Sequence, residues 1–151
     1  MPQDDLRVSL DVEQQNPALQ NSPRFRTLVV DGNFFFSGFL EKFLESEGHF
    51  ILTAATVKDA IAKTRQFQPD LILLDNELEG HAGPALLAEL LLEQASAAVI
   101  LMARKPSISE AVEAIKLGAI DYFERPLDAQ KLKHAIETQK ALFKSRTEFD
   151  D

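Results

Sequence analysis

The stretch that decides the fold is Pro69-Asp70-Leu71-Ile72-Leu73-Leu74-Asp75. Its four apolar residues follow one another directly, and successive side chains of a strand point to opposite faces of a sheet. A strand that is apolar on both faces is typical of the middle of a parallel sheet, where helices cover both sides. The stretch therefore predicts a buried parallel strand that ends at an acidic residue, Asp75.

Apolar runs before and after this strand alternate with segments of helical spacing. They predict strands over about 25–30, 50–52, 71–74, 98–102 and 120–124, and helices over about 35–47, 56–68, 84–95, 107–117 and 128–144. Strands that alternate with helices in this way form βαβ units. We therefore predict an α/β fold, a doubly wound parallel sheet of five strands with five helices.

Residues with capping side chains mark several of the predicted helix ends. Ser107 and Glu110 have the Ser-x-x-Glu spacing of a capping box, and Thr56 is a second candidate N-cap. Gly118 is suited to end the fourth helix, because glycine readily adopts the left-handed conformation found at such ends. Asp128 is expected to cap the last helix.

The composition is that of an ordinary globular protein of one domain. The chain has 151 residues, no cysteine and a formal net charge of -8, from 24 acidic and 16 basic residues. This acidic balance disfavours direct binding to nucleic acid, which needs Lys and Arg to neutralise phosphates. No apolar run approaches the roughly 18 residues needed to cross a bilayer, and the N-terminus lacks the features of a secretory signal. We expect a cytoplasmic protein without membrane contact.

The N-terminal residues differ in composition from the rest. Residues 1–24 contain three prolines among Gln, Asn and Asp, which predicts a flexible leader. Within it, Leu6, Val8, Leu10 and Val12 alternate with polar residues, so an added edge strand or a docking segment is the alternative. We divide the chain into a leader over 1–24, one domain over 25–144 and a polar tail over 145–151.

Four residues are expected at the carboxyl ends of the predicted strands: Asp31, Asp75, Ala103 and Arg125. Ligands of doubly wound sheets bind at this edge, where the strand order reverses. Two carboxylates that converge there repel each other and need a cation or a proton, and carboxylate oxygens are ligands that Mg²⁺ prefers. A carboxylate can also attack a phosphorus atom, and a nearby Arg would stabilise the transferred charge. This attack needs a metal at the site, and because a lone Asp after a strand is most often a turn or cap residue, only the joint placement of these residues favours the chemistry.

Four motifs carry a resemblance to a known family: Leu28-Val29-Val30-Asp31, Pro69-Asp70-Leu71-Ile72-Leu73-Leu74-Asp75, Lys116-Leu117-Gly118-Ala119 and Arg125-Pro126-Leu127. In order and spacing, from about residue 26 to 144, they resemble the response-regulator receiver domains of two-component signalling. The resemblance implies a flavodoxin-like fold and a signalling switch rather than a metabolic enzyme. It also implies a histidine kinase or phosphotransfer protein as phosphoryl donor, a downstream protein partner, and homodimer formation as a further association.

The resemblance assigns roles residue by residue. Asp75 matches the aspartate that accepts the phosphoryl group, and Asp31 matches a carboxylate that helps to hold Mg²⁺. Arg125 stands at the position of the family's phosphoryl-contacting lysine, and Tyr122 at that of an aromatic residue that changes rotamer on activation. The expected signalling surface lies on the fourth helix, the fifth strand and the fifth helix, and includes Glu110, Glu113, Tyr122 and Lys131.

Three positions depart from the family's pattern and make the expected site atypical. Gly32 stands where a second acidic residue is expected. Ala103 replaces the Thr or Ser whose hydroxyl meets the phosphoryl group and draws the following loop inward. Arg125 replaces Lys, and its planar guanidinium is not equivalent to a compact ammonium. The missing acid at Gly32 weakens Mg²⁺ binding. The missing hydroxyl at Ala103 removes the usual link between phosphorylation and loop movement.

Two questions stay open on the sequence alone. The first concerns Glu77, which we hypothesise to replace the lost acid in part and to complete a Mg²⁺ site with Asp31 and Asp75; the alternative is that its side chain faces solvent. The second concerns function. The leading hypothesis is a receiver phosphorylated on Asp75, and the alternative is a pseudo-receiver that binds proteins or dimerises without phosphorylation.

Overall fold

The computed structural model describes residues 25–46, 50–78 and 83–150. The predicted leader over 1–24 lies outside these residues, and so does its alternative as an edge strand. Among the described helices, none is both long enough and apolar enough to span a bilayer.

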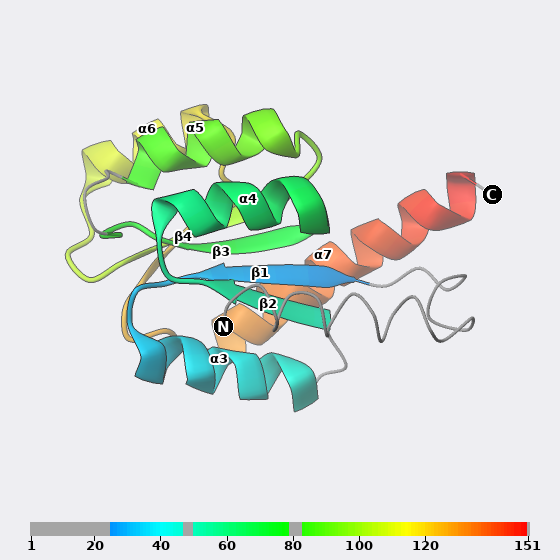
Figure 1. The fold of residues 1–151 in the computed structure, drawn as a ribbon, viewed down its shortest axis with the longest axis horizontal. Helices are drawn as coiled ribbons and strands as arrows, with labels where there is room; N and C mark the ends of the chain where they lie inside the picture. Colours follow the sequence, from blue (N-terminus) through cyan, green and yellow to red (C-terminus); the bar gives the residue numbers. More distant parts are fainter. Residues whose placement is uncertain (1–24, 47–49, 79–82, 151) are drawn as a thin grey trace.

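Five parallel strands form one sheet (Figure 1). They are β1 (Arg26–Val30), β2 (Phe50–Ala54), β3 (Leu71–Asp75), β4 (Ala98–Ala103) and β5 (Asp121–Glu124), in the spatial order β2-β1-β3-β4-β5. The order reverses at β1, because β2 lies on one side of it and β3 on the other. This reversal opens a crevice at the carboxyl ends of β1 and β3.

Helices cover both faces of the sheet, as the predicted doubly wound fold requires. The described helices are α3 (Phe34–Ser46), α4 (Val57–Phe67), α5 (Gly83–Glu93), α6 (Ile108–Lys116) and α7 (Ala129–Asp150). Figure 1 shows α4, α5 and α6 on one face and α3 and α7 on the other. Two separate clusters of buried apolar residues lie under these two groups of helices.

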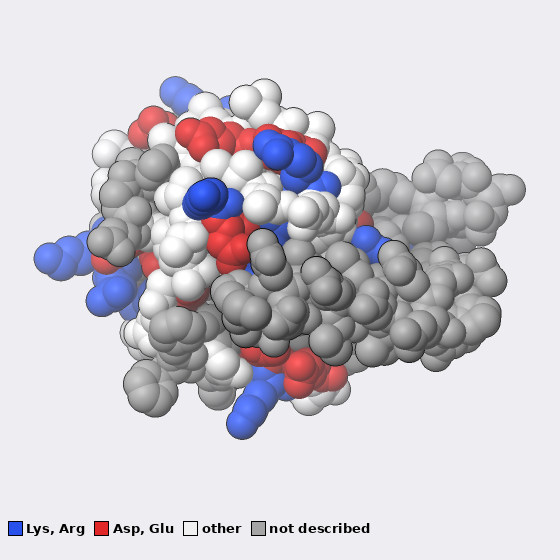
Figure 2. Space-filling view, in the orientation of Figure 1, with Lys and Arg blue, Asp and Glu red and all other residues white. Residues whose placement is uncertain are grey.

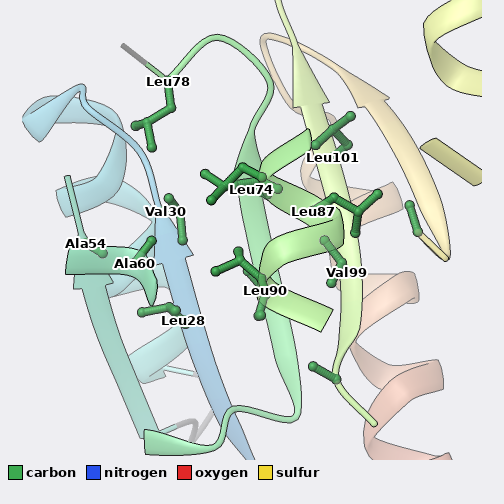
Figure 3. Packing of buried hydrophobic residues seen from close by; sticks show 14 of the residues in the cluster. Leu28, Val30, Ala54, Ala60, Leu74, Leu78, Leu87, Leu90, Val99 and Leu101 are labelled. Atoms are coloured by element: carbon green, nitrogen blue, oxygen red, sulfur yellow. The ribbon is translucent and has the colours of Figure 1, made fainter. Parts of the chain in front are cut away.

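β3 is the strand on which both clusters depend. All five of its residues are buried. Ile72 and Leu74 pack with residues of α4 and α5, and Figure 3 shows Leu74 beside Leu87 and Leu90 of α5. Leu71 and Leu73 pack against α3 and α7. The prediction that this strand is apolar on both faces because helices cover both sides is therefore confirmed.

Most predicted helix boundaries are also found. The side chains of Thr56 and Ser107 accept hydrogen bonds from the backbone three residues later, at 3.1 and 3.4 Å. Gly118 has a φ of 116°, in the region that favours glycine. The Asp128 carboxylate accepts from the backbone N–H of Gln130 at 2.9 Å, which caps α7. Short side chains with local hydrogen bonds thus set where the helices begin and end.

The C-terminal end differs from the expectation of a polar tail. α7 continues to Asp150, through residues that the sequence analysis separated from the domain at position 144. No Gly or Pro occurs between Leu127 and Asp150, so no residue in this segment forces the helix to stop.

Gly83 begins α5 beside the turn that follows β3. A Cβ atom at position 83 would overlap the side chain and the Cα of Asn76. We therefore expect Gly83→Ala to displace this turn and to lower the free energy of unfolding by about 1–3 kcal/mol, the usual cost of overpacking. Urea denaturation measures this change.

Gly38→Ala is the matched control for Gly83→Ala. Gly38 lies within α3, and a Cβ atom there meets no atom within 4 Å. Alanine favours a helix over glycine by up to about 1 kcal/mol, so this substitution is expected to raise the free energy of unfolding. Equal effects of the two substitutions would contradict the packing argument.

Candidate functional site

The four residues predicted at the carboxyl ends of the strands lie at one edge of the sheet. Asp31 directly follows β1 and is 2% exposed, and Asp75 ends β3 and is 4% exposed. Ala103 ends β4, and its carbonyl accepts a hydrogen bond from the backbone N–H of Arg125 at 2.8 Å. This bond fixes the start of the Arg125 side chain, next to the cis peptide between Arg125 and Pro126.

Arg125 lies between the two buried aspartates. Its Nη2 atom is 2.8 Å from Oδ2 of Asp31 and 3.7 Å from Oδ1 of Asp75. Burial of two carboxylates without a cation would be costly, because each charge loses its hydration. The guanidinium therefore serves as the shared counter-charge. Lysine at this position would offer one ammonium in place of several fixed donors.

Asp31 is held by a balance of opposing effects. Burial raises the pKa of its carboxyl group above the ordinary value. A hydrogen bond from the backbone N–H of Asn33 to Oδ1, at 2.9 Å, and the Arg125 guanidinium lower this pKa. Burial outweighs these two contacts and the nearby Asp75 carboxylate acts in the same direction as burial, so the pKa of Asp31 lies above its ordinary value.

The Asp75 carboxylate contacts both the site and the turn that follows it. Its Oδ1 atom accepts a hydrogen bond from the backbone N–H of Glu77 at 2.9 Å. The pocket beside it opens to solvent and is lined by Gly32, Asn33, Ala55, Asp75, Glu77, Leu78 and Arg104. A phosphorylated molecule can therefore approach this side chain from outside.

Glu77 does not join the aspartates. Its Oε1 atom accepts a hydrogen bond from the backbone N–H of Arg104 at 3.0 Å, and its Oε2 atom is 3.7 Å from Nε of the same residue. The carboxylate thus joins the loop after β3 to the loop after β4. It is not simply directed into solvent, although the side chain is 38% exposed.

The arrangement of the carboxylates leaves few free oxygen ligands for a Mg²⁺ ion. Asp31 and Asp75 already share the Arg125 guanidinium, Gly32 contributes no side chain, and Glu77 is engaged elsewhere. Within residues 25–46, 50–78 and 83–150, no three His, Cys, Asp or Glu side chains come together in a group that could hold a metal ion. The predicted grouping of Asp31, Asp75 and Glu77 is therefore not found.

Of the residues predicted for the signalling surface, two meet directly. The hydroxyl of Tyr122 donates to Oε1 of Glu110 at 2.7 Å and accepts from the backbone N–H of Ser107 at 3.3 Å. Glu113 is exposed on α6, and Lys131 is exposed on α7 beside β5. Burial and the hydrogen bond to Glu110 raise the pKa of the Tyr122 hydroxyl above its ordinary value.

Asn76 was missed by the sequence analysis. It directly follows Asp75, is 8% exposed, and donates from Nδ2 to Oε1 of Glu110 at 2.5 Å. A polar residue next to a buried strand end was the available signal, but such a residue is most often a simple turn residue. The direction of its side chain depends on α6, which is distant in sequence.

Comparison with known proteins identifies the family of the chain. A family model described as "Response regulator receiver domain" matches residues 27–137. The transcriptional regulatory protein ZraR of Salmonella typhimurium is 34% identical over 119 residues, covering 79% of this chain and 26% of ZraR. The chain thus spans about a quarter of the length of this curated relative.

Solved structures resemble the fold closely. The receiver domain of NtrX from Brucella abortus has a TM-score of 0.69 and 32% identity, over 75% of this chain and 96% of that domain. A response regulator from Burkholderia pseudomallei was solved with a phosphorylated aspartic acid, a calcium ion and citrate. It has a TM-score of 0.71 and 26% identity, and the match covers 84% of this chain and 75% of that protein. The chain therefore belongs to the response-regulator receiver family, the signalling domains of two-component systems.

Proposed function

We propose that this receiver accepts a phosphoryl group on Asp75. A carboxylate oxygen of Asp75 attacks the phosphorus of a phosphohistidine, the new O–P bond forms as the P–N bond breaks, and the imidazole leaves with the electron pair and takes a proton from solvent. The observation that carries the proposal is the position of Asp75, at the edge of an open pocket with a buried guanidinium 3.7 Å away.

Arg125 is the residue that supports charge in this step. Its guanidinium neutralises Asp31 and lies beside Asp75, so the approach of an anionic phosphoryl group is opposed by less negative charge. Its planar form allows it to bind a carboxylate and a phosphoryl oxygen from different N–H groups. The chemistry is a signalling modification of the protein itself and not metabolic turnover.

Receiver domains in general bind Mg²⁺ or a similar divalent ion. For this chain we infer weak Mg²⁺ binding, because one carboxylate is missing at Gly32 and the other two are paired with Arg125. An ion that enters the site has to displace this pairing.

The proposed partners are proteins. A histidine kinase or phosphotransfer protein supplies the phosphoryl group, and a downstream protein binds the surface of α6, β5 and α7. Support comes from Ile108, Val112 and Ile115, which lie on α6 with exposed fractions of 86%, 47% and 49%. The same apolar side chains suit a homodimer. On the face that Figure 2 draws, which is not the α6-β5-α7 surface, basic side chains are interspersed with acidic ones, which argues against nucleic acid as a partner there.

A pseudo-receiver remains the second candidate function, and one observation favours it. The groups that would meet a phosphoryl group are already paired within the protein. The backbone N–H of Arg104 already donates a hydrogen bond to the Glu77 carboxylate, and the Arg125 guanidinium forms an ion pair with Asp31. A protein with this arrangement would bind its partners without phosphorylation.

Incubation with acetyl phosphate tests the choice between the two functions. We expect the protein to gain the mass of one phosphoryl group, because Asp75 faces the open pocket. Intact mass spectrometry measures this gain, and Asp75→Asn is the control that should lack it. If the mass of the wild-type protein stays unchanged in the presence and absence of Mg²⁺, the pseudo-receiver is the better description.

Mg²⁺ titration tests the role of Glu77 and Gly32. A Cβ atom at Gly32 has no neighbour closer than 3.8 Å, so Gly32→Asp is expected to fit and to add an oxygen ligand. We expect it to tighten Mg²⁺ binding by about tenfold, or about 1.4 kcal/mol, as measured by calorimetry. Glu77→Ala should leave the affinity nearly unchanged, because Glu77 is bound to Arg104. A clear loss of affinity would show that Glu77 is a metal ligand.

The ionisation of Tyr122 tests the contact on the signalling surface. The protein has one tyrosine and no tryptophan, so the phenolate absorbance reports on Tyr122 alone. Burial and the bond to Glu110 favour the neutral phenol and raise its pKa. Glu110→Gln removes the negative charge beside the hydroxyl, so the phenolate should form at lower pH. Glu113→Gln, on the same helix but exposed, is the control and should not shift the titration.

A further inference from the structure

Asn76 is a buried polar residue placed directly after the phosphoryl acceptor. Its backbone is held on two sides, because its N–H donates to the carbonyl of Met102 at 2.8 Å and its carbonyl accepts from Gly83 at 3.1 Å. Its side chain points toward α6, where Nδ2 donates to Oε1 of Glu110 at 2.5 Å. A turn at the end of β3 is thereby bonded to a helix that lies 34 residues further along the chain.

The hydrogen bonds continue beyond Glu110. The same Oε1 atom accepts from the Tyr122 hydroxyl at 2.7 Å, and the Tyr122 oxygen accepts from the backbone N–H of Ser107 at 3.3 Å. Ser107 caps the first turn of α6. A continuous row of hydrogen bonds therefore runs from Asn76 to the start of α6 and to β5.

Asn76 is not explained by stability alone. Its Oδ1 atom is buried and has no hydrogen-bond partner in the described part of the chain. A buried acceptor without a partner costs free energy, and an apolar side chain would avoid that cost. Space for the Asn76 side chain also depends on Gly83, since a Cβ atom there would overlap it. The amide is thus accommodated at a cost, and one of its two polar atoms is available for a new bond.

We propose that Asn76 is a positioning residue that couples the phosphorylation of Asp75 to α6 and Tyr122 through Glu110. This proposal rests on the proposed function of Asp75 as the phosphoryl acceptor. Ala103 has no hydroxyl with which to sense the phosphoryl group. The coupling therefore runs through the turn after β3 and not through a side chain at the end of β4.

The first step of the coupling follows from the bond between Asp75 and Glu77. Oδ1 of Asp75 accepts from the backbone N–H of Glu77 at 2.9 Å. Phosphorylation converts one carboxylate oxygen into the bridging oxygen of an acyl phosphate and removes the carboxylate charge, so this acceptor becomes weaker. The N–H of Glu77 then bonds to a phosphoryl oxygen. Because Asn76 lies between the two residues, its amide moves relative to Glu110.

Phosphorylation with acetyl phosphate, followed by two measurements on the same sample, tests the proposal. Intact mass gives the phosphorylated fraction. The NMR signal of the isotope-labelled tyrosine ring reports the environment of Tyr122, because the chain has one tyrosine. In the wild-type protein the ring signal should shift in proportion to the phosphorylated fraction. In Asn76→Asp, which has nearly the same size but cannot donate to Glu110, the shift per phosphorylated molecule should fall at least severalfold.

A double variant in which the donor and the acceptor at positions 76 and 110 are exchanged, called here the reversed pair, distinguishes coupling from a structural defect. In the double variant Asn76→Asp with Glu110→Gln, the amide of residue 110 donates to residue 76, and its oxygen still accepts from Tyr122. This variant should recover the shift. The control Glu113→Gln should show the same shift as the wild-type protein. Asn76→Ala, which adds no charge, should lose the shift as Asn76→Asp does and serves if the Asp variant fails to fold.

Different outcomes would overturn the coupling and the phosphorylation of Asp75. A full shift of the Tyr122 signal in phosphorylated Asn76→Asp or Asn76→Ala would overturn the coupling and leave phosphorylation of Asp75 intact. The absence of any mass gain in the wild-type protein would overturn the proposed function and, with it, this coupling. Loss of the shift in both single variants without recovery in the reversed pair would also overturn the direct contact with Glu110.

Discussion

The guanidinium of Arg125, shared by two buried carboxylates, is the contact on which the carboxyl edge of the sheet depends. Asp31 directly follows β1 and Asp75 ends the neighbouring β3, so both carboxylates lie at the same edge of the sheet. Without a cation they would repel each other and lose their hydration at the same time. Arg125 resolves both problems from the end of β5, and its backbone is fixed by the carbonyl of Ala103. The end of β5 is thereby tied to the central strands.

Much of the fold follows from local patterns in the sequence. The run Leu71–Leu74 predicts a central strand because only burial on both faces accommodates consecutive apolar residues. Ser107, Thr56 and Gly118 predict helix ends because their effects act within one turn. The length of α7 was missed, since polar composition alone does not stop a helix when glycine and proline are absent.

The site was only partly predictable, for a different physical reason. The positions of Asp31, Asp75 and Arg125 follow from the ends of strands, which the topology fixes. The direction of a side chain in a loop depends on partners that are distant in sequence. Glu77 is bonded to Arg104, 27 residues away, and Asn76 is bonded to Glu110. The position of Glu77 two residues after Asp75 therefore suggested that it is a metal ligand. In the structure its carboxylate instead joins the loop after β3 to the loop after β4.

α6 has a weak attachment to the rest of the protein, and this has a consequence for its motion. Among its nine residues Ala114 alone is buried, while Ile108 is 86% exposed. Elements with little buried surface open at lower free energy than the core, so their backbone amides exchange with solvent sooner. The buried Ala114 and the hydrogen bonds of Glu110 and Ser107 with Asn76 and Tyr122 are the contacts that hold α6 on the domain. A small perturbation is therefore enough to shift the populations of the conformations of α6. β3 is buried throughout and stays in place.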